Sequence, residues 1–316
     1  PLVGAELILL VGPPTSERAA GYPAGSAVVG FLDPARDVDL VRTLVERHIT
    51  AFAMEAIPRT TLAQSMDALS SQATAAGYHA VLLAASTTPK MFPMMITAAG
   101  TVPPVKVLVL GAGVAGLQAI ATAKRLGARV SAYDIRPEVR EQIESLGARF
   151  VAAPVESDAA TESGYAREVG SDVQQRQHEA LAPHVADADV VITTAQVPGR
   201  AAPTLVTADM VAAMRPGSVV VDMAAASGGN CELTQADAQV EHAGVLVLGP
   251  TDLAARAAAD ASEMYARNLA AFVERITGED AQLSVDLDDQ IVGGACITHA
   301  GEIHHDGARR AAGVVG

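Results

Sequence analysis

KVLVLGAGVAGLQAIATAKRLGARVSAYD, residues 106–134, runs from an apolar stretch through a glycine-rich turn and an amphipathic segment to a second apolar stretch. This order predicts a strand, a helix and a parallel strand, the first unit of a doubly wound sheet. The turn, Gly111-Ala-Gly-Val-Ala-Gly116, has glycines where a tight turn, a close approach of the backbone to a pyrophosphate, and close helix packing need them. The helix N-terminus adds N–H donors and positive potential. The stretch therefore predicts a dinucleotide site.

Asp134 indicates which dinucleotide binds. It ends the second strand, 18 residues after Gly116, where a carboxylate accepts hydrogen bonds from the adenosine ribose and repels a 2′-phosphate. An arginine just beyond the strand, Arg136, can also accommodate a 2′-phosphate. Because Arg136 precedes Pro137, it is about equally well explained as a solvated turn residue. We therefore expect NAD(H) rather than NADP(H).

The pattern continues well beyond this unit. Short β-branched runs alternate with helical patterns as far as residue 250, which is typical of a parallel sheet buried on both faces. Six strands are expected, the number that a complete Rossmann sheet needs: residues 106–110, 129–134, 149–152, 189–193, 218–222 and 245–248.

A smaller α/β region flanks this sheet. Its expected elements are strands at 6–11, 27–31 and 50–54, helices at 38–47 and 260–276, and a β-rich tail at 283–304. The economical fold is an α/β protein in which the Rossmann domain is inserted into a second, smaller domain. We expect a discontinuous, flavodoxin-like α/β domain at 1–58 and 259–316, and the Rossmann domain with its connecting helix at 59–258.

The composition excludes several kinds of partner. The 316 residues carry a net charge of −14 and a pI near 4.9, so nucleic acid or an anionic lipid surface would be repelled. No apolar run reaches the roughly 18 to 20 residues of a membrane span. Cys231 and Cys296 are too few and too far apart for a disulfide framework or a zinc cluster. We expect a cytoplasmic protein that inserts no segment into a membrane and binds no metal.

Two polar segments each allow two interpretations. Between 59 and 72, Gln64, Asp67 and Ser70 follow helical spacing; they form either a solvated helix face or, since apolar residues 77–83 would bury the helix, the polar lining of a ligand cleft. Residues 156–177 form either a crossover helix with a solvated loop or a mobile lid over the cofactor.

Several segments carry a resemblance to a known family. They are Arg59 with AQSMDALSSQ (63–72), FPMMITAAGTVPP (92–104), GAGVAGLQAIATAKRLG (111–127), YDIRPEVR (133–140), GYA (164–166), TTAQVPG (193–199) and GGNC (228–231). Together they resemble the NAD(H)-binding component of proton-translocating transhydrogenases. The resemblance covers nearly all of the chain after about residue 40. Residues 1–35 match poorly, and the family's first strands, which precede the one at Glu6, are expected to be missing here.

The resemblance implies a function. Hydride would pass from NADH to NADP⁺ held on a partner beta subunit, coupled to proton movement by membrane-spanning subunits with which the chain associates peripherally, as a homodimer. Such a reaction needs positioning rather than a general acid or base.

The resemblance also implies roles for individual residues. Arg59, Gln64, Asp67 and Ser70 would surround the nicotinamide and its ribose, and a mobile loop would close over the site with Tyr165. Ala226 stands where relatives often carry a polar residue, so no contact is carried over there. The remaining expected cofactor contacts are Gly111, Gly113, Val114, Ala115, Gly116, Asp134, Ile135, Arg136, Thr194, Ala195 and Gln196.

Two other functions remain open. An NAD-dependent alanine dehydrogenase would share both domains, although Arg59-x4-Gln64-Ser-Met-Asp67 is the transhydrogenase form of its region. A non-catalytic NAD-binding module would serve regulation or assembly instead of turnover.

Overall fold

The computed structural model describes residues 2–152, 171–197, 201–278 and 282–314. The chain divides into two compact units: Pro1–Gln72 together with Ala259–Gly316 (unit 1), and Ala73–Ala258 (unit 2). This division differs from the expected boundary at residue 58.

Unit 2 contains the doubly wound sheet that the sequence predicts. In the described residues its strands lie in the order β11-β12-β10-β9-β6-β7-β8, and every pairing except that of β11 with β12 is parallel. With β11 left aside, this is the Rossmann order. The strands are β6 (Lys106–Leu110), β7 (Arg129–Tyr133), β8 (Arg149–Phe150), β9 (Val190–Thr193), β10 (Val219–Asp222), β11 (Gln239–His242) and β12 (Val245–Leu248).

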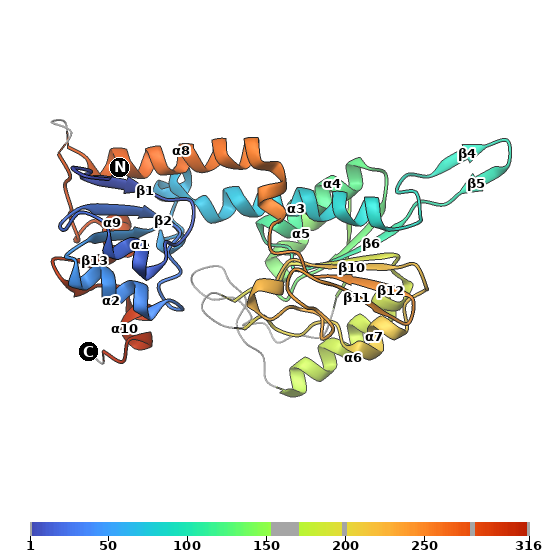
Figure 1. Cartoon of the computed structure of the whole chain (residues 1–316). Helices are drawn as coiled ribbons and strands as arrows, with labels where there is room; N and C mark the ends of the chain where they lie inside the picture. Colours follow the sequence, from blue (N-terminus) through green and yellow to red (C-terminus); the bar gives the residue numbers. More distant parts are fainter. Residues whose placement is uncertain (1, 153–170, 198–200, 279–281, 315–316) are drawn as a thin grey trace. The chain divides into compact units, whose positions relative to one another are not determined.

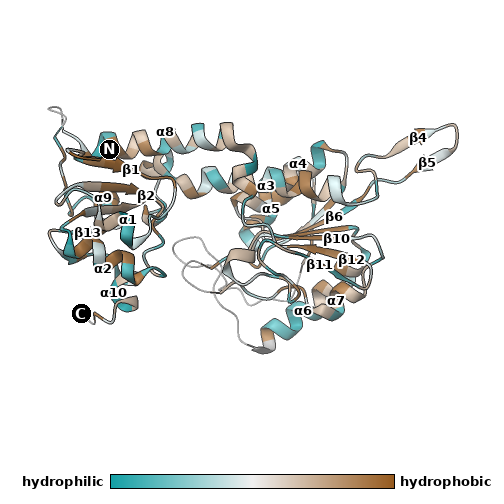
Figure 2. Ribbon diagram, in the orientation of Figure 1, coloured by the Kyte–Doolittle hydropathy of each residue, from teal (hydrophilic) through white to brown (hydrophobic). Residues whose placement is uncertain are grey.

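Helices cover both faces of this sheet, as Figure 1 shows. Within β6, Val107 and Val109 join one buried cluster, and Leu108 and Leu110 join the other. Since successive side chains of a strand point to opposite faces, a strand buried on both faces is apolar throughout; Figure 2 shows the central strands in brown accordingly. The covering helices are α4 (Val114–Arg125) and α5 (Arg140–Ser145) on one face, and α6 (Ser171–Asp187) and α7 (Ala208–Ala212) on the other.

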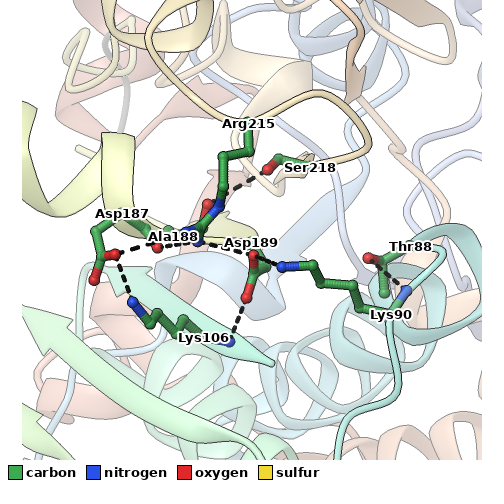
Figure 3. A network of polar contacts seen from close by, with 8 residues as sticks. All are labelled: Thr88, Lys90, Lys106, Asp187, Ala188, Asp189, Arg215 and Ser218. Atoms are coloured by element: carbon green, nitrogen blue, oxygen red, sulfur yellow. Dashed lines mark hydrogen bonds and ion pairs between the residues drawn. The ribbon is translucent and has the colours of Figure 1, made fainter. Parts of the chain in front are cut away.

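The amino ends of the strands carry a network of charges (Figure 3). The buried Asp189 precedes β9 and accepts hydrogen bonds from Lys90 Nζ at 2.6 Å, Arg215 Nη2 at 2.9 Å and Lys106 N at 2.9 Å. Burial raises the pKa of Asp189, but these donors outweigh burial and leave the pKa below its ordinary value. This edge is opposite to the glycine turn, which follows the carboxyl end of β6.

A hairpin of β4 (Met95–Thr97) and β5 (Gly100–Val102) extends from unit 2 beyond its sheet (Figure 1). It follows the long helix α3 (Ala68–Thr87). The hairpin is exposed along its whole length.

Unit 1 has its own sheet and helices and is built from both ends of the chain. Its sheet has the order β1-β2-β3-β13-β14 in the described residues. The first three strands are parallel, and β13 and β14 are antiparallel to their neighbours, unlike the parallel sheet of a flavodoxin-like domain. Its elements are β1 (Leu7–Leu9), α1 (Ser16–Ala20), β2 (Ala27–Gly30), α2 (Val38–Glu46), β3 (Thr50–Ala53), α8 (Ala258–Ile276), α9 (Gln290–Ala295), β13 (Cys296–His299), β14 (Glu302–Ile303) and α10 (Asp306–Ala311).

Segment 59–72 belongs to unit 1 because α8 holds it. Asn268 Nδ2 donates to Ser65 O at 2.8 Å, and Gln72 Nε2 donates to Ala261 O at 3.0 Å. These contacts join positions 203 and 189 residues apart in the sequence, so the local pattern from which the boundary was predicted could not reveal them.

Candidate cofactor site

The glycine turn has the geometry of a phosphate cradle. Gly111 adopts a φ of 97°, which a residue with a side chain rarely tolerates. A Cβ on Gly116 would lie 1.9 Å from Gly111 O, so only glycine lets α4 begin this close to β6. Gly113 precedes α4 with no side-chain cap, and a Cβ there would meet no atom within 4 Å. The backbone N–H groups of the first turn are therefore open to an anion, as a pyrophosphate requires.

Asp134 follows β7 beside this turn. Its side chain is 5% exposed, and its Oδ2 accepts from Ala112 N at 2.7 Å, so the carboxylate and the glycine turn are directly joined. Arg136 lies against the same carboxylate, with Nε 2.9 Å from Oδ1. Ile135, between them, is partly buried.

The segment after β9 forms the other wall. Thr194 Oγ1 donates to Gly111 O at 2.9 Å, so this segment contacts the glycine turn. Gln196 is exposed, and its Nε2 donates to Met223 O at 3.2 Å. The structure thus brings Thr194 and Asp134 to the same carboxyl edge of the sheet as the glycines, at the point between β6 and β9 where the strand order reverses and dinucleotides bind.

Two buried residues at this edge, Asp222 and Asn230, were not predicted as site residues. Asn230 binds the backbone of Ala195 through both atoms of its amide group. One signal was available: Asp222 is the last residue of its strand, as Asp134 is the last residue of the strand predicted at 129–134. Asn230 stands in the GGNC motif, but spacing alone does not reveal its partner.

In unit 1, the predicted polar residues lie on a broken segment rather than on one helix. A 3-10 helix, η2 (Thr61–Met66), carries Gln64 and is followed by Asp67, after which α3 begins. Asp67 and Ser70 are brought together: Ser70 N and Ser70 Oγ donate to the carboxylate at 2.8 Å and 2.6 Å. Arg59 and Gln64 are exposed. The single helical face expected for Gln64, Asp67 and Ser70 is interrupted, because Gln64 lies on η2 and Ser70 lies on α3.

Tyr165 lies outside the described residues, as does the part of segment 156–177 that precedes α6. Residues 171–177 belong to α6. Both interpretations of segment 156–177, a crossover helix with a solvated loop and a mobile lid, therefore remain predictions.

Both cysteines are buried. Burial raises the pKa of Cys231 and of Cys296 to about 11, which removes their nucleophilic thiolate at neutral pH. The described residues contain no cluster of His, Cys, Asp or Glu that could hold a metal ion. In the same residues, no helix combines the length and apolar character needed to cross a membrane.

Comparisons with known proteins match both units. The family model "Alanine dehydrogenase/PNT, C-terminal domain" matches residues 80–306, and the corresponding N-terminal domain model matches residues 2–76. An NAD(P) transhydrogenase subunit alpha protein of Rhodospirillum rubrum is 47% identical over 293 residues, covering 92% of this chain and 76% of that protein. The crystal structure of transhydrogenase from Sinorhizobium meliloti superimposes with a TM-score of 0.82 at 44% identity, covering 96% of this chain and 80% of that chain. Alanine dehydrogenase of Halomonas elongata is 32% identical over 240 residues, 75% of this chain and 59% of that protein.

Proposed function

This chain belongs to the alanine dehydrogenase/PNT family, and on that basis we propose that it is the NAD(H)-binding component of a transhydrogenase. Hydride passes between NADH on this chain and NADP⁺ on a partner subunit. The observation that carries the proposal is the open glycine turn joined to Asp134, in a chain 47% identical to a transhydrogenase alpha subunit.

The residues of the chain would bind and orient the cofactor without transferring protons. Bound NADH supplies the hydride. The N–H groups at the start of α4 hold the pyrophosphate, and Asp134 accepts hydrogen bonds from the adenosine ribose. Arg59, Gln64, Asp67 and Ser70 position the nicotinamide.

Other subunits complete the proposed enzyme. The relative from Rhodospirillum rubrum is named as a subunit of its transhydrogenase. We infer an NADP(H)-binding beta subunit as the hydride acceptor and membrane-spanning subunits that couple the reaction to proton translocation. This chain then lies on the cytoplasmic side, held to the membrane only through them.

A second copy of the chain is the proposed partner of the hairpin. Four large apolar side chains are exposed there: Met94 (57%), Met95 (40%), Ile96 (77%) and Val102 (38%). Hairpins of two strands are marginally stable on their own, and exposed apolar patches mark interaction sites. Pairing the hairpin with a second copy would cover these side chains and support a homodimer.

Binding and transfer are tested separately. The protein is titrated with NADH and then mixed with a purified NADP(H)-binding subunit, NADPH and the acetylpyridine analogue of NAD⁺, whose reduction is followed by absorbance. We expect NADH binding and analogue reduction that depends on the added subunit. Oxidation of alanine with NAD⁺ in the absence of any partner would identify an alanine dehydrogenase instead, and NADH binding with neither reaction would identify a non-catalytic module.

A further inference from the structure

The carboxylate of Asp222 is completely buried at the carboxyl end of β10. Burying a carboxylate is costly unless donors surround it. None of its described partners is a cation; they are Thr193 Oγ1 (2.8 Å) and Ala224 N (2.9 Å) on Oδ1, and Asn230 N (2.7 Å), Cys231 N (2.9 Å) and Thr234 Oγ1 (2.6 Å) on Oδ2. Asp222 therefore fastens the loop that follows β10 to the end of the sheet.

The loop that follows β10 carries Asn230. Its side chain is also completely buried. Oδ1 accepts from Ala195 N at 2.9 Å, and Nδ2 donates to Ala195 O at 2.8 Å. The amide group thus makes the two backbone hydrogen bonds that a neighbouring strand would make with Ala195. The second hydrogen of Nδ2 is donated to Pro203 O at 2.8 Å. Because both amide hydrogens and the amide oxygen are engaged, the side chain has one orientation.

Ala195 lies in the wall of the cofactor site. The preceding residue, Thr194, binds Leu110 O through its backbone N at 2.8 Å and Gly111 O through its hydroxyl at 2.9 Å. Thr194 thus joins this wall to the glycine turn, while Asn230, held by Asp222, fixes the position of the next residue, Ala195. A displacement of about 1 Å at such a position costs around a hundredfold in rate.

We propose that Asn230 is a positioning residue for the nicotinamide half of the cofactor and that Asp222 holds it in place. The proposal rests on the proposed function in that the chain must bind NADH. Each half of a doubly wound sheet serves one mononucleotide. The half that contains β7 carries Asp134 and takes the adenosine end. The half formed by β9, β10 and β12 carries Ala195 and Asn230 and takes the nicotinamide end.

The variant Asn230→Asp tests this division. It keeps the size of the side chain and an oxygen that can accept from Ala195 N, but it replaces the Nδ2 donor by an oxygen facing two carbonyl groups. NADH and ADP affinities are measured by calorimetry on the full chain. We expect NADH to bind at least about tenfold more weakly and ADP, which lacks the nicotinamide half, to bind within about twofold of the wild-type affinity. Hydrogen exchange of residues 191–197 without any nucleotide should become faster.

Asp189→Asn is the matched control for the second variant, Asp222→Asn. Both change a buried, hydrogen-bonded carboxylate of the same sheet, but Asp189 lies at the opposite edge. The two variants should lose comparable thermal stability, whereas only Asp222→Asn should weaken NADH binding. Thr234→Val, which removes one donor to Asp222, serves if Asp222→Asn does not fold.

Equal weakening of NADH and ADP, or equal weakening by Asp189→Asn, would show a general loss of order and overturn the proposal. So would unchanged NADH affinity in Asn230→Asp. If the wild-type chain binds NADH but passes no hydride to the partner subunit, the proposed function fails while the ratio of NADH to ADP affinity still decides the role of Asn230.

Discussion

The guanidinium of Arg136 lies along the carboxylate of Asp134, with Nε 2.9 Å from Oδ1 and Nη2 2.9 Å from Oδ2. The hydrogen bond to Asp134 raises the pKa of Arg136 above its ordinary value. Ala112 N and Arg136 N donate to the same carboxylate. Since a carboxylate offers about four lone-pair directions, the ribose hydroxyls of the proposed NADH would share or displace these contacts. The guanidinium of Arg136 is therefore paired with the carboxylate of Asp134, which supports the expectation that it does not bind a 2′-phosphate.

Replacing Asp134 by asparagine should shift the preference from NADH toward NADPH. The variant loses the charge that repels a 2′-phosphate and loosens the pairing of Arg136, so we expect NADH to bind about tenfold more weakly and NADPH to bind more tightly than to the wild type. Fluorescence titrations with both nucleotides measure this. Glu141→Gln, which removes an exposed charge of α5, should change neither affinity. A wild-type chain that binds NADPH as tightly as NADH would refute the role of Asp134.

Asp67→Asn should separate the proposed cofactor role of Asp67 from its structural role. In the wild type, Ser70 N donates a hydrogen bond to Asp67 Oδ1 at 2.8 Å. Asparagine retains an oxygen that can accept this hydrogen bond, so the start of α3 should keep its cap. We expect hydride transfer to fall about tenfold or more, with a smaller change in NADH affinity and a melting temperature close to that of the wild type. Asp67→Ala should additionally lose about 1 kcal/mol of stability. Full transfer activity in Asp67→Asn would mean that Asp67 serves only as the cap.

Ile96→Asp should dissociate the dimer. Ile96 is 77% exposed, and a charge at the centre of a buried apolar contact is costly unless it is paired. Sedimentation equilibrium at micromolar concentration should show a dimer for the wild type and a monomer for the variant. Val3→Asp changes a fully exposed apolar residue of unit 1 and should leave the dimer intact. A monomeric wild-type chain would exclude the hairpin contact.

Glu55→Gln should remove a pH dependence from the stability of unit 1. Glu55 Oε1 accepts from Leu32 N at 2.8 Å and Asp33 N at 2.6 Å, whereas the buried Oε2 has no described partner. Burial raises the pKa of Glu55 and outweighs the backbone hydrogen bonds that lower it. Protonated Glu55 therefore stabilises the folded state. This stabilisation is fully present below the ordinary pKa of 4.5, and it is lost as pH rises through the higher pKa that Glu55 has in the folded state.

Urea unfolding between pH 4.5 and pH 8 measures this effect. Glutamine keeps an oxygen for the two N–H donors without titrating. The free energy of unfolding of the wild type should therefore decline, relative to that of the variant, as pH rises through the raised pKa of Glu55. A constant difference across this range would show that Glu55 does not titrate within it.

Lys90→Met should weaken the charge network at the amino edge in a pH-dependent way. Asp189, whose pKa is lowered, stabilises the fold above the unfolded-state pKa of 3.8 and loses this contribution as pH falls. Lys90 is 52% exposed and Asp189 only 5%, so we expect a loss of about 1 kcal/mol at pH 7 that shrinks below pH 4. The comparison variant, Lys106→Met, removes a side chain paired with the exposed Asp187 and should cost less. An equal loss at both pH values would contradict the charge pairing.

The sequence was sufficient for the sheet of unit 2 because its central strands are apolar on both faces. β6 begins and ends where predicted, and β9 and β10 begin one residue later than predicted. The edge strand β11 was missed: Gln239-Val-Glu-His242 is polar, and its pairing is imposed by the turn at Ala243 and Gly244, both at positive φ. In the tail, the helix α9 was likewise missed because it is short.

The sequence did not reveal those contacts of the candidate site that join distant parts of the chain. The strand-end position of Asp134 and the glycine turn follow local rules, so spacing sufficed. The break at Asp67 depends on α8, whose Asn268 holds Ser65. The contact of Asn230 with Ala195 spans 35 residues and is specified only once the sheet has formed.

The return of the C-terminal segment to unit 1 has a consequence for synthesis on the ribosome. β13 pairs with β3 in the sheet of unit 1, yet it emerges roughly 240 residues later. At about 5 to 20 residues per second, the nascent chain would hold the edge of β3 unpaired for about 10 to 50 seconds. The inserted unit can finish folding in that interval. An open strand edge favours aggregation, so the yield of soluble protein in the cell should depend on translation speed and on chaperones that cover this edge.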